Sequence, residues 1–131
     1  MVLAVLATIV LAAGCGGESP AVKGDQHASD PARIADPAQV KAALADGAVA
    51  LDVRTPAEFG TGHLRGAVNL DVQSSDFDAQ VAALDHGKTY VVYCKSGNRA
   101  AAAIQRMTDL GFTHLINGGG FAQLAPVVEL G

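Results

Sequence analysis

The sequence has 131 residues, enough for one domain and an additional N-terminal segment. Half of the residues are hydrophobic and 17% are charged, which suits a globular protein and argues against an intrinsically disordered chain. The formal net charge of −4 at neutral pH gives no support to a nucleic-acid partner. Because tryptophan is absent and other aromatic residues are few, the core must consist mainly of valine, leucine, isoleucine and alanine.

The N-terminal segment opens with an uncharged apolar run, VLAVLATIVLAAGC, which ends at Cys15. About a dozen apolar residues are too few for a membrane-spanning helix, which needs roughly 20, but they match the core of a signal peptide. The small residues before the cysteine resemble the lipobox of bacterial lipoproteins, although no lysine or arginine follows Met1 and Ala12 stands where leucine is usual. The resemblance implies a signal peptide over residues 1–14, lipidation of Cys15 and an exported protein anchored to the membrane of the bacterial cell envelope. The alternative is an ordinary apolar first helix.

A flexible linker is predicted next, over residues 15–32. The run GGESPAVKGDQHASDP consists largely of glycine, serine, proline and charged residues, which favour a tether over packed structure. We therefore expect the folded domain to occupy residues 33–131. A domain of this size can stand alone, so we expect a monomer.

Helical and strand patterns alternate through the rest of the chain. Asp36 as N-cap, Pro37 at the first helical position and Gly47 as the stop predict a helix over DPAQVKAALADG. Short apolar runs predict strands at residues 48–53, 66–72, 89–94 and 112–118. Periodic apolar positions predict helices over residues 74–87 and 98–111, with a short final helix from Phe121. Strands that alternate with helices predict an α/β fold around a parallel sheet.

Cys94 lies where the apolar run TYVVYC ends, just before the helix that begins near Asn98. Sites in open parallel sheets form beyond the carboxyl ends of the strands. The free N–H groups and the positive end of a helix N-terminus bind anions, so they favour the thiolate form of a cysteine placed there. Gly97 allows the loop backbone to turn its N–H groups inward, and Lys95 and Arg99 add positive charge. The pattern indicates a nucleophilic sulfur that attacks or holds an anionic substrate; the alternative is a small buried hydrophobic residue.

The loop YCKSGNRA resembles the active-site loop of the rhodaneses, the thiosulfate sulfurtransferase family, whose pattern is Cys-x-x-Gly-x-Arg. Two further segments resemble that family: LDVRTPAEFGTGHLRGAVNL at residues 51–70 and LINGGGFAQL at residues 115–124. The resemblance implies a single rhodanese-like domain with a mainly parallel five-stranded sheet flanked by helices. The sequence departs from the family pattern at Leu64-Arg65, where Ile-Pro is usual, and at Gln123, where tryptophan is usual.

The resemblance also implies a mechanism and its partners. Cys94 would take the outer sulfur of thiosulfate or of a persulfide, and would pass it to cyanide or to a thiol acceptor. Backbone N–H groups would hold the negative charge of the Cys94 persulfide. The residues expected to bind the substrate in this way are those of the loop: Lys95, Ser96, Gly97, Asn98 and Arg99. We also expect Lys95 to attract the anion and Arg99 to clamp the loop by pairing with an acidic group.

Other polar residues have more modest expected roles. Asp52 and Arg54, at the end of a strand, are expected to support the site by orienting loops. Glu58 and His63 are expected to form local hydrogen bonds at the following turn. No spacing of histidine, cysteine, aspartate and glutamate indicates a metal site, and neither a metal nor a cofactor is expected.

Loop length separates the activities that this fold supports. Arg99 follows Cys94 by five positions, the short form found in rhodaneses. The related dual-specificity phosphatases and arsenate reductases have a loop one residue longer, which fits a phosphate-sized anion. The short loop therefore favours sulfur transfer. A non-catalytic binding module is the other alternative, and the intact Cys94, Gly97 and Arg99 count against it.

Overall fold

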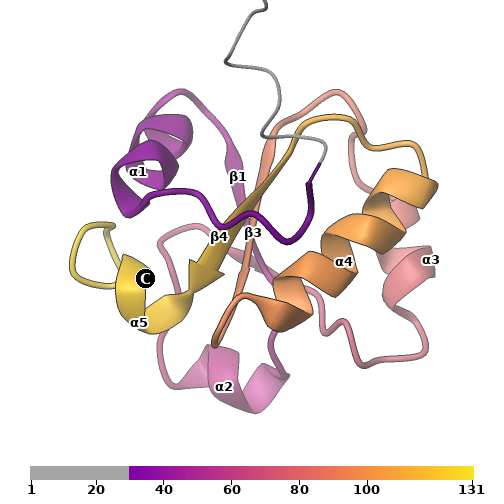
Figure 1. The fold of residues 1–131 in the computed structure, drawn as a ribbon. Coiled ribbons are helices and arrows are strands. Elements are labelled where there is room, and N and C mark those ends of the chain that lie inside the picture. Colours follow the sequence, from indigo (N-terminus) through magenta and orange to yellow (C-terminus); the bar gives the residue numbers. More distant parts are fainter. Residues whose placement is uncertain (1–29) are drawn as a thin grey trace, which may run out of the picture.

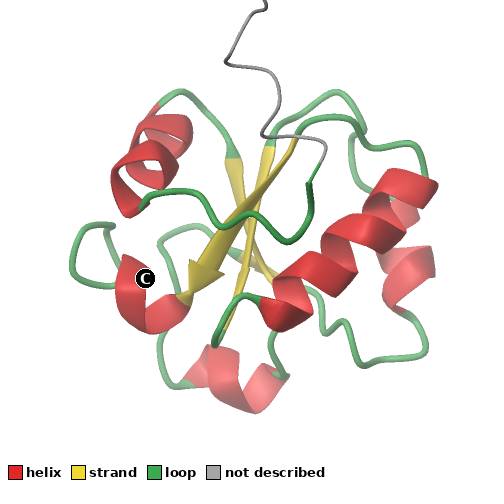
Figure 2. Cartoon of the chain, in the orientation of Figure 1, coloured by secondary structure: helices red, strands yellow, loops and turns green. Residues whose placement is uncertain are grey.

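The computed structural model describes residues 30–131, so the predicted signal peptide, Cys15 and nearly all of the predicted linker lie outside the described residues. The described chain forms an α/β fold in which one sheet lies between two groups of helices (Figures 1 and 2). The strands of the sheet are β1 (Val49–Asp52), β2 (Val68–Asn69), β3 (Tyr90–Cys94) and β4 (Leu115–Gly120). Neighbouring strands are parallel, in the order β2-β1-β3-β4.

The sheet of the described residues has four strands rather than the five expected. Two isolated bridges lie outside the strands, and the one that extends the sheet is the parallel bridge between Ile34 and Asn117 of β4. Asp36 is the N-cap of α1 (Pro37–Ala45), so the chain enters a helix before the pairing can lengthen. The strand predicted over residues 66–72 is also shorter than expected, because only the two residues of β2 pair with β1.

The helices cover both faces of the sheet and one end of it. On one face lie α1 and α5 (Phe121–Leu124), and on the other lie α3 (Phe77–Ala82) and α4 (Asn98–Asp109). The short helix α2 (Pro56–Gly60) lies at the carboxyl ends of the strands, beside the turn that leads from β3 into α4 (Figure 1). Within residues 30–131, no helix has both the length and the apolar character needed to cross a bilayer.

Two helices begin with the same local arrangement. The Asp36 carboxylate accepts a hydrogen bond from the Ala38 N–H, and the Gln39 side chain accepts one from the Asp36 N–H, which confirms the predicted start of α1. Thr55 and Glu58 form the same arrangement, a capping box, at the start of α2. The α2 helix has five residues, too few for an apolar period to be visible, and the sequence did not predict it.

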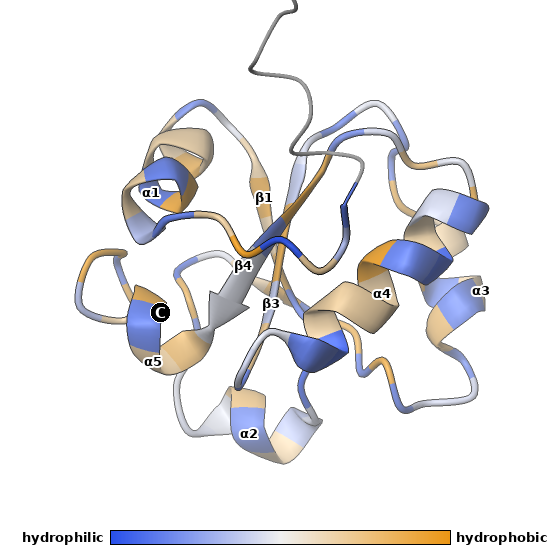
Figure 3. Ribbon diagram, in the orientation of Figure 1, coloured by the Kyte–Doolittle hydropathy of each residue, from blue (hydrophilic) through white to orange (hydrophobic). Residues whose placement is uncertain are grey.

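Strand β3 lies at the centre of the hydrophobic core, and all five of its residues are buried. Its side chains alternate between the two faces: Cys94 belongs to the core beneath α3 and α4, whereas Tyr93 belongs to the core beneath α1 and α5. The buried face of α4 consists of Ala100, Ala103, Ile104 and Met107. Figure 3 shows hydrophobic and hydrophilic residues alternating along this helix. The packing of α4 against β3 places the Cys94 side chain directly below the start of that helix.

Candidate active site

Cys94 is the last residue of β3, and residues 95–97 form a tight loop before α4 begins at Asn98. Its side chain has no exposed surface. The Gly97 N–H donates a hydrogen bond to Cys94 Sγ at 2.9 Å. A donor at this position stabilises negative charge on the sulfur, and it belongs to the free N–H groups at the N-terminus of a three-turn helix.

Gly97 has a backbone conformation that the loop requires. Its φ of 98° is in the left-handed region, where residues with a Cβ are strained. A Cβ added here would also lie 2.8 Å from Ile34 Cδ1 and 3.3 Å from the Gly119 Cα. The glycine thus gives the chain the turn that aims an N–H at the sulfur, and it makes room for the neighbouring segments.

Gly119 and Gly120, at the end of β4, form a glycine wall beside the loop. A Cβ on Gly120 would collide with the Lys95 carbonyl oxygen, and a Cβ on Gly119 would lie 2.7 Å from Ile34 Cγ2. The absence of side chains here allows two backbones to approach each other closely. This explains why the predicted closing segment contains consecutive glycines.

Arg99 forms a two-bonded ion pair with Glu58 of α2. The Nη1 atom donates to Oε1 at 2.8 Å and the Nη2 atom donates to Oε2 at 2.9 Å. This pair lowers the pKa of Glu58 from 4.5 to about 2 and raises the pKa of Arg99. Arg99 therefore has the acidic partner expected from the sequence, and the partner is the capping residue of a helix that the sequence did not predict.

The other loop side chains are open to solvent. Lys95, Ser96 and Asn98 are exposed, whereas Gly97 is buried. The Lys95 ammonium forms no ion pair within the described part of the chain. It is therefore free to attract an anion, whereas the Arg99 guanidinium is already occupied.

Asp52 and Arg54 lie apart from the sulfur, on the opposite face of the sheet. Arg54 Nη2 donates to Asp52 Oδ2 at 2.6 Å and to the Gly62 carbonyl oxygen at 2.7 Å. Both side chains are almost completely buried, and the bond to Asp52 raises the pKa of Arg54. The guanidinium also stacks over the Phe121 ring, with its Cζ 4.5 Å from the centroid. The geometry brings these two residues to each other and to the Gly62 turn, and not to Cys94.

Asn117 of β4 is a site residue that the sequence did not indicate. Its side-chain Nδ2 donates to the Gly97 carbonyl oxygen at 3.3 Å and to the Pro31 carbonyl oxygen at 2.8 Å. Its Oδ1 accepts from the Gly119 N–H at 2.9 Å. In the sequence, Asn117 stands out only because it immediately precedes the glycine run. That position does not reveal its contacts with Pro31 and Gly97, which are distant in the sequence.

His63 contacts its own turn. Its ring stacks on the Phe59 ring with 3.8 Å between centroids, and Nδ1 lies 3.0 Å from the Phe59 carbonyl oxygen. Across residues 30–131, no three histidine, cysteine, aspartate or glutamate residues are grouped as metal ligands.

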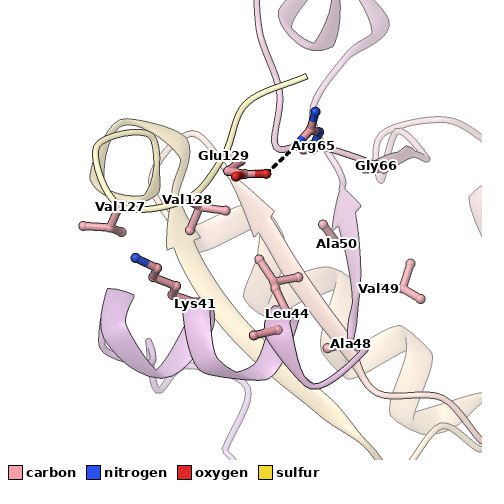
Figure 4. Close-up of a pocket in the computed structure, with 11 residues that line it drawn as sticks. Lys41, Leu44, Ala48, Val49, Ala50, Arg65, Gly66, Val127, Val128 and Glu129 are labelled. Carbon is pink, nitrogen blue, oxygen red and sulfur yellow. Dashed lines mark hydrogen bonds and ion pairs between the residues drawn. The ribbon is translucent and has the colours of Figure 1, made fainter.

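A cavity of about 560 Å³ lies away from Cys94, between α1, β1 and the C-terminal residues. Apolar side chains such as Leu44 and Val128 line it, and the Arg65–Glu129 ion pair lies at its edge (Figure 4). None of its lining residues belongs to the loop at residues 94–99, so this cavity is distinct from the candidate active site.

Comparison with known families gives a match between residues 36–124 and the model of the rhodanese-like domain. The chain belongs to the rhodanese-like domain family. The matched residues include the Cys94 loop, the Glu58 partner of Arg99 and the glycine wall. The family match thus covers the site as well as the sheet.

The relatives of this rhodanese-like domain include thiosulfate sulfurtransferases. The chain is 31% identical over 75 residues to thiosulfate sulfurtransferase PspE of Escherichia coli, covering 57% of this chain and 72% of the relative. It is 36% identical over 91 residues to thiosulfate sulfurtransferase GlpE of Pseudomonas aeruginosa, covering 68% and 79%.

Solved structures share the rhodanese-like fold. The rhodanese-like domain of an Anabaena protein has a TM-score of 0.65 at 23% identity and covers 75% of this chain and 77% of that one. A rhodanese-related protein from Thermoplasma volcanium has a TM-score of 0.64 at 26% identity, covering 76% and 97%. An E. coli rhodanese solved with anions has a TM-score of 0.55 at 28% identity, covering 64% and 98%.

Proposed function

We propose that this protein is a sulfurtransferase that moves sulfane sulfur through a persulfide on Cys94. The observation that supports the proposal most directly is the 2.9 Å hydrogen bond from the Gly97 N–H to Cys94 Sγ at the start of α4. Relatives named as thiosulfate sulfurtransferases support the class of reaction. Thiosulfate or a persulfide is the proposed donor, and cyanide or a thiol is the proposed acceptor.

The reaction has two displacement steps. In the first, the Cys94 thiolate attacks the outer sulfur of thiosulfate, a new S–S bond forms, and the old S–S bond breaks with its electron pair leaving on sulfite. In the second, cyanide or a thiolate attacks the terminal sulfur of the persulfide. The bond to Cys94 then breaks and the thiolate is regenerated. No external oxidant or reductant is consumed, because the sulfur atom that enters also leaves.

The loop residues divide the work between them. The Gly97 N–H, with the other backbone N–H groups of the loop, holds negative charge on the attacking sulfur and on the persulfide. Lys95 is the exposed cation that attracts the anionic donor. Arg99 acts on the shape of the loop, because both of its terminal nitrogens are bonded to Glu58.

Two alternatives predict different measurements. A non-catalytic binding module would not need a donor aimed at Cys94 Sγ, and a phosphatase or arsenate reductase would need a wider loop. The decisive experiment measures thiosulfate turnover with cyanide as acceptor, beside a Cys94→Ser variant. We expect turnover that the variant abolishes, and a wild-type protein that becomes one sulfur atom heavier after exposure to thiosulfate. A folded protein with neither turnover nor mass change would overturn the proposal in favour of a binding module.

We also propose, from the sequence alone, that the chain is exported and held on the membrane by a lipid on Cys15. Labelling with radioactive palmitate in a bacterial host would test this. Label that persists in a Cys15→Ser variant would contradict it.

A further inference from the structure

Asn117 lies at a junction of three segments that meet behind the Cys94 loop. It is 3% exposed, and each polar atom of its side chain has a partner. One partner is in the loop, one is in the N-terminal segment of the domain, and one is in the glycine run of β4. A buried amide whose nitrogen and oxygen both have hydrogen-bond partners favours one arrangement of these segments over others.

The contact with the loop is made at the residue that faces the sulfur. Gly97 donates its N–H to Cys94 Sγ, and its carbonyl oxygen accepts from Asn117 Nδ2 and from the Ala101 N–H. The side chain of Asn117 thus helps to fix the Gly97 carbonyl group, while the N–H group of the same residue is bonded to the sulfur. Glycine has the widest backbone freedom of any residue, so its orientation depends on such external contacts.

Residues 30–35, which precede α1, pack against the outer side of the same junction. Asn117 binds this segment at two points: Nδ2 donates to the Pro31 carbonyl oxygen, and the Asn117 carbonyl oxygen accepts from the Ala35 N–H within the isolated bridge between Ile34 and Asn117. The Ile34 side chain covers the positions where a Cβ on Gly97 or Gly119 would stand. In Figure 1 this segment crosses over β4 on its way to α1.

We propose that Asn117 is a positioning residue for the sulfur-transfer reaction. It does not touch the reacting sulfur; it fixes Gly97 so that the N–H of that glycine stays aimed at Cys94, and it ties residues 30–35 to the back of the loop. The inference rests on the proposed function for its catalytic consequence, but the positioning of Gly97 is a property of the fold alone.

The test compares Asn117→Asp with Asn69→Asp in the full chain. Aspartate at 117 keeps an oxygen for the Gly119 N–H but has no N–H groups for Gly97 and Pro31. Asn69 is a control, because its Nδ2 also donates to two backbone carbonyl oxygens, those of Asp52 and Arg54, neither of which belongs to the Cys94 loop. Both substitutions remove a two-bonded amide donor, and Asn117→Asp is expected to lower the melting temperature more, because position 117 is buried and position 69 is half-buried.

Two readouts distinguish positioning from stability. The first is the single-turnover rate at which thiosulfate loads sulfur onto Cys94, measured well below the melting temperature: we expect Asn117→Asp to lower it about tenfold with KM little changed, and Asn69→Asp to leave it nearly unchanged. The second is hydrogen exchange of the Gly97 amide by NMR, which does not require activity. We expect the Gly97 amide to lose protection about tenfold in Asn117→Asp only.

Wild-type protection of Gly97 in Asn117→Asp, or equal losses in both variants, would overturn the proposal. If the wild type itself transfers no sulfur, the proposed function fails while the exchange measurement still decides the role of Asn117. If Asn117→Asp does not fold, Asn117→Ser replaces it, because the shorter serine side chain cannot span the same contacts.

Discussion

Arg99 and Glu58 are 41 residues apart in the sequence, and their side chains meet through two parallel hydrogen bonds of 2.8 and 2.9 Å. The pair joins the first turn of α4, which follows the Cys94 loop, to α2 at the same end of the sheet. Thr55 fixes the carboxylate further, because its Oγ1 donates to Glu58 Oε1 at 3.1 Å. Arg99 therefore holds two elements together, whereas Lys95, the other cation of the loop, forms no ion pair within residues 30–131.

Glu58→Gln is expected to reduce kcat/KM for sulfur transfer about tenfold, because a neutral amide holds Arg99 less firmly and the loop loses its fixed geometry. The measurement is the thiosulfate and cyanide assay. Glu129→Gln is the matched control: it breaks another arginine–glutamate pair, Arg65–Glu129, whose side chains are 69% and 77% exposed. A Glu58→Gln enzyme within about twofold of the wild type would show that the pair does not position the loop.

The same pair predicts how stability depends on pH. Folding lowers the pKa of Glu58 from 4.5 to about 2, so the folded state favours the ionised carboxylate. The stabilisation is fully present above pH 4.5 and is lost as the pH falls from 4.5 towards 2. Denaturant unfolding of the wild type and of Glu58→Gln should therefore give a constant difference in unfolding free energy between pH 7 and 5. The difference should shrink at pH 3 and nearly vanish at pH 2, and a difference that grows with acid would contradict the assignment.

Gly97→Ala is expected to lower the free energy of unfolding by about 2 kcal/mol, because alanine is strained at a φ of 98° and its Cβ meets Ile34. Part of this cost comes from the Ile34 side chain and part from the backbone. A double-mutant cycle with Ile34→Ala should recover about 0.5 kcal/mol or more of it. Purely additive losses of unfolding free energy would mean that the Ile34 side chain moves aside without strain. The loss in Gly97→Ala would then come from the backbone conformation alone.

Asp52→Asn is expected to cost about 3 kcal/mol of stability, since it leaves the Arg54 charge buried without its anionic partner. Activity per folded molecule should be retained, because the pair lies across the sheet from the sulfur. The comparison is Asp78→Asn, which breaks the exposed pair with Arg106 and should change stability by about 0.5 kcal/mol or less. A folded Asp52→Asn protein with greatly reduced turnover would instead place Asp52 in the catalytic machinery.

The features predicted correctly from the sequence depend on residues that are close together along the chain. The cap at Asp36, the stop at Gly47 and the turn at Gly97 follow from the conformational preferences of single residues. The buried strand that ends at Cys94 follows from an uninterrupted apolar run. Together these local signals were sufficient to place the sulfur at the carboxyl end of a parallel strand and below a helix N-terminus.

The features that were missed depend on residues brought together by the fold. Nothing near Glu58 indicates Arg99 as its partner, and nothing near Asn117 indicates Gly97 or Pro31. The resemblance implied a fifth strand that the described residues do not form, since Ile34 makes one bridge to Asn117 and then α1 begins. The strand predicted over residues 66–72 was too long because its apolar residues pack against the core without pairing along their whole length.

The glycine run at the end of β4 has a consequence for anyone who wishes to move this site to another scaffold. The six-residue loop from Cys94 to Arg99 does not enclose itself: the backbone of Gly119 and Gly120 lies against it, and the Ile34 side chain covers Gly97 and Gly119. A graft of the loop alone would meet ordinary side chains where Lys95 and Gly97 need open space. A transplant of this site would therefore need β3 with the Cys94 loop, the adjacent strand β4 with its terminal glycines, and residues 30–35, which cover them.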